Sequence, residues 1–396
     1  MSDAAADRNT AHGSLRADAE WRAVVAAFAF NGLLFGAWAA RVPTFKAQFE
    51  LSPGTLGLLL LALAAGAIVS FPFAGNLSER WGTDRLTVRS AMAYGPALIG
   101  IALAPDEYLL GGGLFLFGAL HGAMDVAMNG WGARVETRLR RSTMSVFHAM
   151  FSLGAGLGAA SGFAAVKLGF GPLAHFTAIA VFGGGAALVL MVPVQAKAPP
   201  PHAGGNSKSL PSLPSGALCL VGLIAFSVAI GEGAMADWSA VFLHAVIDAS
   251  EAQAALGYAA FSVAMVLTRF SGGVLVERFG PVVTTRLSGA TAFAGLMIVV
   301  VTQSFWIALA GFALVGVGYA VVMPLVFSRA AADPVIRPGP AIASVATLSY
   351  GGMLLGPPVV GFIAQLSNLR VSFMALALLA LLAVLLASQL RVTAQP

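Results

Sequence analysis

The sequence predicts an all-helical membrane protein with twelve spanning helices arranged in two six-helix halves. Three observations lead to this fold class. Of the 396 residues, 58% are hydrophobic and only 10% are charged. Apolar stretches of about 20 residues, the length that crosses a bilayer core, follow one another along the chain. In addition, one loop sequence occurs twice. Soluble domains carry about 25% charged residues. We therefore expect lipid to surround most of this chain, and the apolar stretches to be helices, because backbone polar groups in lipid must be hydrogen-bonded internally.

The candidate spans are runs of low charge that end at Pro, Gly or charged residues. They cover residues 22–42, 55–74, 86–104, 109–132, 143–166, 172–193, 216–243, 252–275, 283–302, 305–328, 340–364 and 370–390. Residues 1–21 hold no apolar segment, so they predict a cytoplasmic tail rather than a cleaved signal peptide. A linker rich in Pro, Gly and Ser at 194–215 would separate one six-helix bundle, 22–193, from a second, 216–390, before a short cytoplasmic tail at 391–396.

The basic residues predict the orientation. With both termini in the cytoplasm, seventeen Lys and Arg residues fall on the cytoplasmic side, and four fall on the opposite side: Arg41, Lys46, Lys167 and Arg370. This asymmetry follows the positive-inside rule and predicts an integral membrane protein with both termini in the cytoplasm. Because no dense basic tract interleaves with aromatic residues, the net charge of +5 does not predict nucleic-acid binding.

One loop sequence is duplicated. GNLSERWG at 75–82 is echoed by GVLVERFG at 273–280, which is 198 residues later and thus half the chain length. At the same offset His121 aligns with Tyr319 and Asp125 with Met323. Two parallel six-helix repeats are the architecture of one large group of transporters.

The duplicated loop resembles the signature loop of the major facilitator superfamily, G-x-L-a-D-r-x-G-r-r, with Glu79 in the place of the usual Asp. The chain is also similar to the MosC/YbjJ-type bacterial group, and Asp125 followed by Asn129 resembles, more distantly, the fucose/proton symporter. The pieces shared with the MosC/YbjJ-type group are W-A-x-R-x-P at 38–43, H-x-x-x-S-L-G at 148–154, E-G-x-x-x-D-W at 232–238, R-F-x-G-G at 269–273 and G-P-P at 356–358.

The resemblance implies a cavity lined by the first, fourth, seventh and tenth helices, with alternating access between the two sides. It also implies that the duplicated loop takes part in gating and that an Arg of the loop meets an acid at the end of the fourth helix, for which Glu136 is the candidate. The expected gating residues of the loops are Gly75, Glu79, Arg80, Gly82, Arg85, Gly273, Glu277, Arg278 and Gly280.

Carboxylates inside spans are the main candidates for function. Asp125 shares a helical face with His121 and Asn129 at three- and four-residue steps. A carboxylate within a span is costly and faces the bundle interior or a water-filled path. We expect Asp125, Glu232 and His148 to take part in proton coupling.

Other polar and aromatic residues within spans are candidates for lining the solute cavity, although each could serve packing alone. They are Asn31, Trp38, His121, Asn129, Tyr319 and Tyr350. Arg41 and Asp237 lie near the outer ends of their helices and could pair as an outer gate. Asp237, beside Trp238, could instead occupy an ordinary position in the interfacial aromatic belt.

These features predict a secondary active transporter of a small polar solute, sugar- or inositol-like, with transport coupled to protons through Asp125. The sequence holds no Walker, G-x-S-x-G or HExxH motif, so we expect no enzyme activity, cofactor or metal. We expect a monomer with the solute, a proton and the lipid bilayer as its partners. Two alternatives stay open: a proton-driven exporter of drugs or metabolites, and a membrane sensor or scaffold that does not transport.

Overall fold

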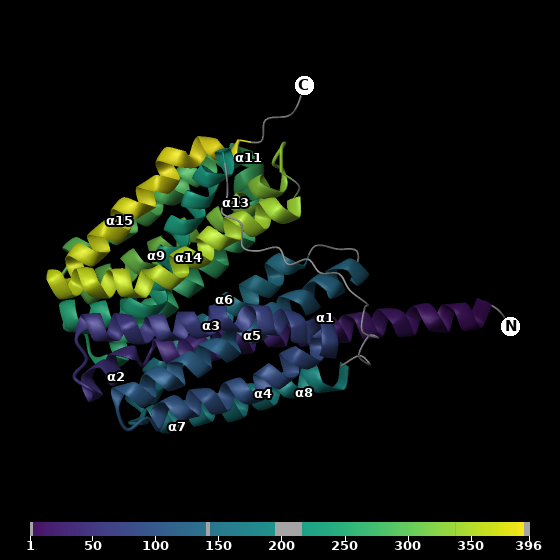
Figure 1. Cartoon of the computed structure of the whole chain (residues 1–396), viewed down its shortest axis with the longest axis horizontal. Coiled ribbons are helices and arrows are strands. Elements are labelled where there is room, and N and C mark those ends of the chain that lie inside the picture. The colour runs from purple at the N-terminus through teal and green to yellow at the C-terminus, as the bar shows by residue number, and fades with distance from the viewer. Residues whose placement is uncertain (1–2, 140–142, 195–215, 337, 392–396) are drawn as a thin grey trace. The chain divides into compact units, whose positions relative to one another are not determined.

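The computed structural model describes residues 3–139, 143–194, 216–336 and 338–391 (Figure 1). Every regular element in these ranges is a helix. The α-helices are α1 (Asp3–Ala39), α2 (Val42–Gln48), α3 (Pro53–Trp81), α4 (Thr83–Ala102), α5 (Glu107–Leu139), α6 (Met144–Lys167), α7 (Pro172–Ala178), α8 (Gly184–Met191), α9 (Ala217–Val246), α10 (Glu251–Ala254), α11 (Leu256–Val301), α12 (Phe305–Tyr319), α13 (Val322–Ala331), α14 (Pro338–Leu366) and α15 (Leu369–Leu386). A π-helical turn, Ile179–Gly183, joins α7 to α8.

The helices coincide with the expected spans. Within the described ranges, ten helical stretches are long and apolar enough to cross a membrane, and one of them, Glu251–Val301, contains the eighth expected span and all but the last residue of the ninth. The third expected span is α4, which lies outside these ten. The all-helical fold class is confirmed. The first helix begins at Asp3, and the linker at 195–215 lies outside the described residues, as does the tail at 392–396.

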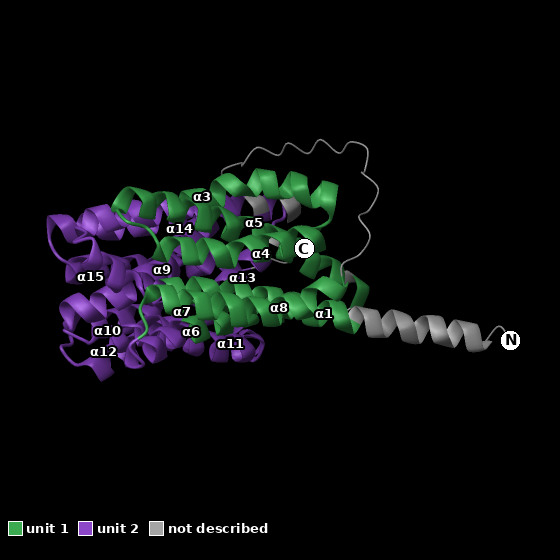
Figure 2. Cartoon of the chain, turned by 90° about the horizontal axis from the view of Figure 1, so that it is seen from below, with its two compact units in different colours: residues 1–38, 65–158, 170–205 green, residues 39–64, 159–169, 206–396 purple. Residues whose placement is uncertain are grey.

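The chain forms two compact units, which Figure 2 shows in different colours. Unit 1 consists of residues 1–38, 65–158 and 170–205, and unit 2 of residues 39–64, 159–169 and 206–396. In unit 1, α4 packs against α5, α7 and α8, and in unit 2, α9 packs against α14 and α15 while α11 packs against α12 and α15. Each unit is described separately below.

The duplicated loop has the same backbone turn in both copies. Gly82, between α3 and α4, has φ +93°, and Gly280, at the kink inside α11, has φ +73°. Residues with a Cβ rarely adopt such φ values, so both turns require glycine. Gly75 and Gly273 differ, because a Cβ at either position would meet nothing within 4 Å.

Glycines bring the backbones of α1 and α6 into direct contact in unit 1. A Cβ built on Gly32 would lie 2.0 Å from the carbonyl oxygen of Phe151, and one on Gly36 would lie 1.9 Å from that of Ala155. The contact is reciprocal, because a Cβ on Gly154 would lie 2.0 Å from the carbonyl oxygen of Ala29. Small residues of this kind allow close helix packing in lipid, where burial of apolar surface does not drive helices together.

Glycines also approach the backbone of a neighbouring helix closely in other helix pairs. A Cβ on Gly66 of α3 would lie 2.0 Å from a backbone oxygen of α5. In unit 2, a Cβ on Gly316 of α12 would lie 2.2 Å from a backbone oxygen of α11, and one on Gly352 of α14 would lie 2.5 Å from a backbone oxygen of α9. Close glycine contacts therefore fix the core helix pairs of both units.

We predict that Gly36→Ala lowers the melting temperature of the purified protein by several degrees, because the new methyl group would force α1 and α6 apart at a cost of about 1–3 kcal/mol. Gly100→Ala in α4 is the matched control, since nothing lies within 4 Å of its Cβ position and alanine favours the helix by about 1 kcal/mol. Thermal unfolding in detergent measures both. Equal melting temperatures for the two variants would contradict the packing role.

Candidate functional site

Unit 1 contains a hydrogen-bonded group of polar side chains centred on α5. The amide nitrogen of Asn129 donates to the Oδ1 of Asp125 at 3.1 Å. One turn earlier, the Nδ1 of His121 lies 3.0 Å from the hydroxyl oxygen of Tyr94 on α4. The amide nitrogen of Asn31 on α1 donates to the backbone oxygen of His121 at 3.5 Å. We call these five residues the α5 cluster.

The α5 cluster joins three helices inside unit 1. Tyr94 and Asn31 are fully buried, and Tyr94 is close enough to Asp125 to interact with it electrostatically. The ring of Phe35 lies 5.3 Å from that of His121. The Oδ1 of Asn31 is buried and accepts no hydrogen bond from any described residue. The cluster thus combines one carboxylate, two amides, an imidazole and a phenol in an apolar surrounding.

Unit 2 contains a second polar group, formed by Glu232 on α9, Tyr258 and Arg269 on α11, and Tyr319 on α12. We call it the α9 cluster. Glu232 and Arg269 interact electrostatically, and the Nε of Arg269 donates to the backbone oxygen of Ala320 at 3.2 Å. Opposite charges from two helices thus lie within electrostatic range of each other inside one unit.

Two atoms of the α9 cluster are buried without a hydrogen-bond partner in the described part of the chain: the Oε1 of Glu232 and the hydroxyl of Tyr319. Tyr319 packs over Gly231, where a Cβ would lie 2.4 Å from the hydroxyl oxygen. The glycine beside Glu232 therefore lets Tyr319 approach α9. Tyr258 interacts electrostatically with both Glu232 and Asp237.

Other candidates for coupling and cavity lining are His148, Trp38 and Tyr350. The ring of His148 packs edge-on against that of Phe28, with the ring centres 5.2 Å apart, and its partnership with Asp125 stays a prediction. Trp38 is buried, whereas Tyr350 is 41% exposed. Across the described ranges, no group of three or more His, Cys, Asp or Glu residues could hold a metal ion.

Arg41 forms an ion pair with Glu251, and the expected pair of Arg41 with Asp237 stays a prediction. The Nη1 of Arg41 lies 2.9 Å from the Oε1 of Glu251, and the side chain of Arg41 is only 2% exposed. The hydroxyl of Thr44 donates to the same carboxylate oxygen. All three residues belong to unit 2, where this contact ties the segment after α1 to α10.

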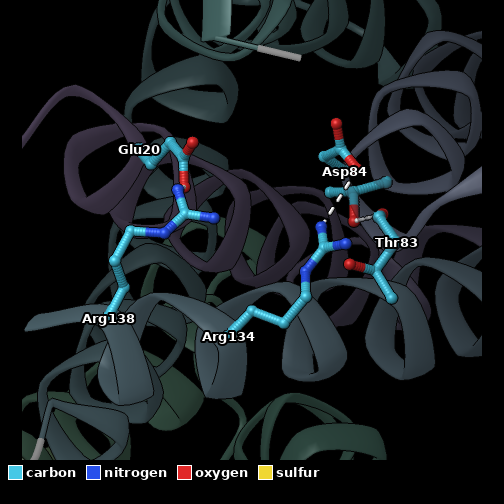
Figure 3. Close-up of polar contacts among 6 residues, drawn as sticks. Glu20, Thr83, Asp84, Arg134 and Arg138 are labelled. Carbon is cyan, nitrogen blue, oxygen red and sulfur yellow. Dashed lines mark hydrogen bonds and ion pairs between the residues drawn. The ribbon is translucent and has the colours of Figure 1, made fainter. Parts of the chain in front are cut away.

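The last turns of α5 bind three neighbouring elements of unit 1. Figure 3 shows Arg134 directed toward Asp84 at the start of α4 and Arg138 directed toward Glu20 of α1. The Nη2 of Arg134 lies 3.0 Å from the Oδ1 of Asp84. Between the two arginines, the Oε2 of Glu136 accepts the backbone N–H groups of Thr143 and Met144, each at 2.7 Å, and so caps α6.

The family resemblance had implied that Glu136 meets an arginine of the loop, and the structure corrects this. Glu136 caps α6, while the loop supplies the acid, Asp84, and α5 supplies the arginine, Arg134. The charges are thus reversed relative to the expected pair. The cause lies in the sequence, because Asp84 stands where the family loop carries a basic residue.

Several residues of these contacts were not predicted from the sequence. Tyr94, Tyr258 and Glu251 interact with candidate residues, but each lies on another helix far away in the sequence. Glu20 of α1 also pairs with a distant residue. The only sequence feature that could have pointed to such residues is a polar side chain within an apolar span. Tyr94 and Tyr258 have this feature, but it does not predict which residues they contact.

The comparisons identify the family. The profile of the Major Facilitator Superfamily matches residues 23–334. An uncharacterized transporter of Sinorhizobium fredii is 44% identical over 94% of this chain and 98% of its own length, and the membrane protein MosC of Rhizobium meliloti is 32% identical over 87% and 83%. The chain belongs to the major facilitator superfamily, and the resemblance to MosC is confirmed.

Solved structures agree on the fold. A bacterial homologue of the human lysosomal transporter Spinster, in an inward-facing and occupied conformation, superposes with a TM-score of 0.71 at 16% identity, over 93% of this chain and 96% of that one. The nucleoside transporter NupG gives 0.68 at 11% identity, over 93% and 98%. These structures show the fold alone. Membership of the family makes the protein a secondary transporter of a small molecule, with many membrane spans, and not an enzyme.

We predict that Asp84→Arg and Arg134→Asp each lower the melting temperature, because each leaves two like charges facing each other at the start of α4. The double swap should restore most of the loss, since it recreates the pair with its charges exchanged. Thermal unfolding of the four proteins forms a double-mutant cycle. A double swap that is as unstable as the sum of the two single changes would refute the direct pair.

We also predict that Glu251→Gln destabilises the protein, because the buried guanidinium of Arg41 loses its ion pair with Glu251 and hydrogen bonds to charged groups contribute about 1.5–3 kcal/mol. Thr44→Val should cost less, since it removes one neutral donor. Glu50→Gln, at an exposed position, is the matched control and should leave the melting temperature unchanged. Equal effects of Glu251→Gln and Glu50→Gln would contradict this assignment.

Proposed function

We propose that the protein carries a small polar solute, sugar- or inositol-like, across a bacterial inner membrane in step with a proton that binds Asp125. The observation that carries the proposal is the α5 cluster, which holds a carboxylate inside a membrane-spanning helix with an imidazole, two amides and a phenol beside it. Such groups donate to and accept from hydroxyl groups. A hydroxyl-rich solute would also stack on an aromatic ring such as Phe35.

The surroundings of Asp125 support a role for a proton. The hydrogen bonds to its carboxylate group and backbone come from the amide of Asn129, and within the described ranges no cationic side chain forms an ion pair with it. A charged carboxylate is expensive in a closed membrane site. Binding a proton removes that charge, so occupancy by a proton would favour the closed state through which the solute must pass.

The α9 cluster supports a second contribution from the other half of the chain. One carboxylate oxygen of Glu232 is buried and has no hydrogen-bond partner among the described residues, and the same is true of the hydroxyl of Tyr319. A solute hydroxyl can accept from the phenol and donate to the carboxylate at once. We therefore assign Glu232 and Tyr319 to solute binding, with Glu232 as a further proton acceptor.

In this proposal both termini lie in the cytoplasm, and access alternates between the two membrane faces by movement of one bundle against the other. Arg41 and Glu251 would belong to the closure on the outer face. The duplicated loops, with Asp84 and Arg134, would belong to the cytoplasmic face, as the charge asymmetry of the sequence supports.

The solute is best found first by ligand-dependent stabilisation. A ligand that binds only the folded protein raises its melting temperature, so a panel of monosaccharides, inositols, nucleosides and organic cations should single out one class. Uptake into right-side-out vesicles and into everted vesicles then separates import from export. A protein that moves no member of the stabilising class in proteoliposomes would favour the sensor or scaffold alternative.

We predict that Asp125→Asn abolishes accumulation driven by a pH gradient in proteoliposomes, while solute counterflow stays partly intact, because the amide cannot take up the coupling proton. Asp248→Asn is the matched control: the same chemical change at an exposed turn should leave both activities as in the wild type. Accumulation by Asp125→Asn at the wild-type level would overturn the assignment of Asp125.

A further inference from the structure

Three arginines, Arg80, Arg85 and Arg89, lie in or shortly after the first duplicated loop of unit 1, and one of them lies over the ring of an exposed tryptophan. Trp81 ends α3 and is 37% exposed, and the guanidinium carbon of Arg89 on α4 lies 4.3 Å from the centre of its ring. Arg80 and Arg85 lie on either side of the same turn. Arg134 and Arg138 nearby are paired with carboxylates, whereas no hydrogen bond or ion pair joins these three guanidinium groups to any described residue.

The arginines mark the end of an apolar exposed face. Arg85 and Arg89 are one turn apart on α4, and Met92 continues the face with 56% of its surface exposed. Ala93, Pro96 and Gly100 follow on the same face and are also exposed. An exposed apolar face on a membrane protein contacts lipid tails. The guanidinium groups therefore lie where the tails give way to headgroups, a depth at which tryptophan is enriched.

The second duplicated loop also places an arginine over the corresponding exposed ring in unit 2, although this arginine, Arg278, corresponds to Arg80 and not to Arg89. The guanidinium carbon of Arg278 lies 5.5 Å from the ring centre of Phe279, which is 43% exposed. Arg286 is exposed, and Leu287 beside it is 55% exposed. Neither arginine pairs with a carboxylate in the described part of the chain. An arginine stacked on an exposed ring thus occurs at the corresponding turn of each half.

We propose that these two turns bind the headgroups of anionic phospholipids, with the phosphate held by the guanidinium groups that stack on Trp81 and Phe279. Stacking occupies the face of a guanidinium and leaves its N–H edge free for bidentate hydrogen bonds to phosphate oxygens. Each basic residue near an anionic membrane surface strengthens binding about fivefold.

The other charges of the two turns leave them basic. Glu79 and Glu277 are exposed at corresponding positions and oppose the arginines, whereas Asp84 is already paired with Arg134. The first turn therefore keeps a net charge of about +2 and the second a net charge of about +1, so the first turn should bind the anionic lipid more tightly.

A lipid fits better than a free phosphate ion. A free ion would use only the guanidinium groups, and nothing would account for the exposed apolar face that continues from them. A phospholipid uses both parts, because its acyl chains lie along α4 from Met92 onward while its phosphate reaches Arg85 and Arg89.

The test uses the full-length protein purified from mixed vesicles that contain equal amounts of phosphatidylglycerol and phosphatidylcholine. Native mass spectrometry counts the lipids that stay bound. We expect the wild type to retain phosphatidylglycerol preferentially and Arg85→Gln with Arg89→Gln to lower this preference by about 25-fold, since two basic residues are removed. Lys46→Gln with Lys167→Gln, at the other ends of spans, changes the net charge equally and should keep the preference.

Two results would overturn the proposal: an equal preference for phosphatidylglycerol in both double variants, or displacement of the lipid by inorganic phosphate as effectively as by short-chain phosphatidylglycerol. Should the double variant unfold, Arg89→Gln alone gives the answer, with about a fivefold loss expected. Trp81→Ala keeps every charge and should weaken retention as well, because the stack orients the guanidinium of Arg89.

Discussion

The close approach of helix backbones at glycines is the constraint on which the rest of the structure depends. Lipid tails are as apolar as leucine side chains, so apolar surface alone gives spanning helices no reason to associate. Gly32, Gly36 and Gly154 instead bring α1 and α6 into backbone contact, and Gly316 and Gly352 do the same for helix pairs of unit 2. Because these contacts leave no space for a methyl group, they fix both the register and the spacing of each pair.

Fixed helix pairs allow polar groups to be placed accurately inside an apolar molecule. His121, Asp125 and Asn129 share one face of α5, and Tyr94 and Asn31 reach them only because α4 and α1 are held at set distances. In unit 2 the role of glycine is direct, since Tyr319 approaches Glu232 over the backbone of Gly231. The same residue type that builds the fold therefore also shapes the candidate site.

The sequence predicts what depends on local pattern and misses what depends on tertiary partners. Apolar length located the spans, and the duplicated loop located Gly82 and Gly280, whose positive φ values the structure shows. The pairing of Arg41 with Glu251 and of Arg134 with Asp84 could not be predicted, because these acids come from other helices. Glu136 shows a subtler failure: its partners lie only seven and eight residues ahead, but capping of α6 depends on where that helix begins.

The two halves share the same backbone turn in the duplicated loop but differ in the polar residues of their spans. At the offset of 198 residues His121 corresponds to Tyr319 and Asp125 to Met323, so the carboxylate of one half has no counterpart at the matching position of the other. Asp125 has an amide beside it, whereas Glu232 has the guanidinium of Arg269. A charged carboxylate with no ion pair is costly inside a span, so it gains from binding a proton. Under the proposed function, this favours Asp125 as the main coupling residue, whereas Glu232 serves as a further proton acceptor that also holds the solute.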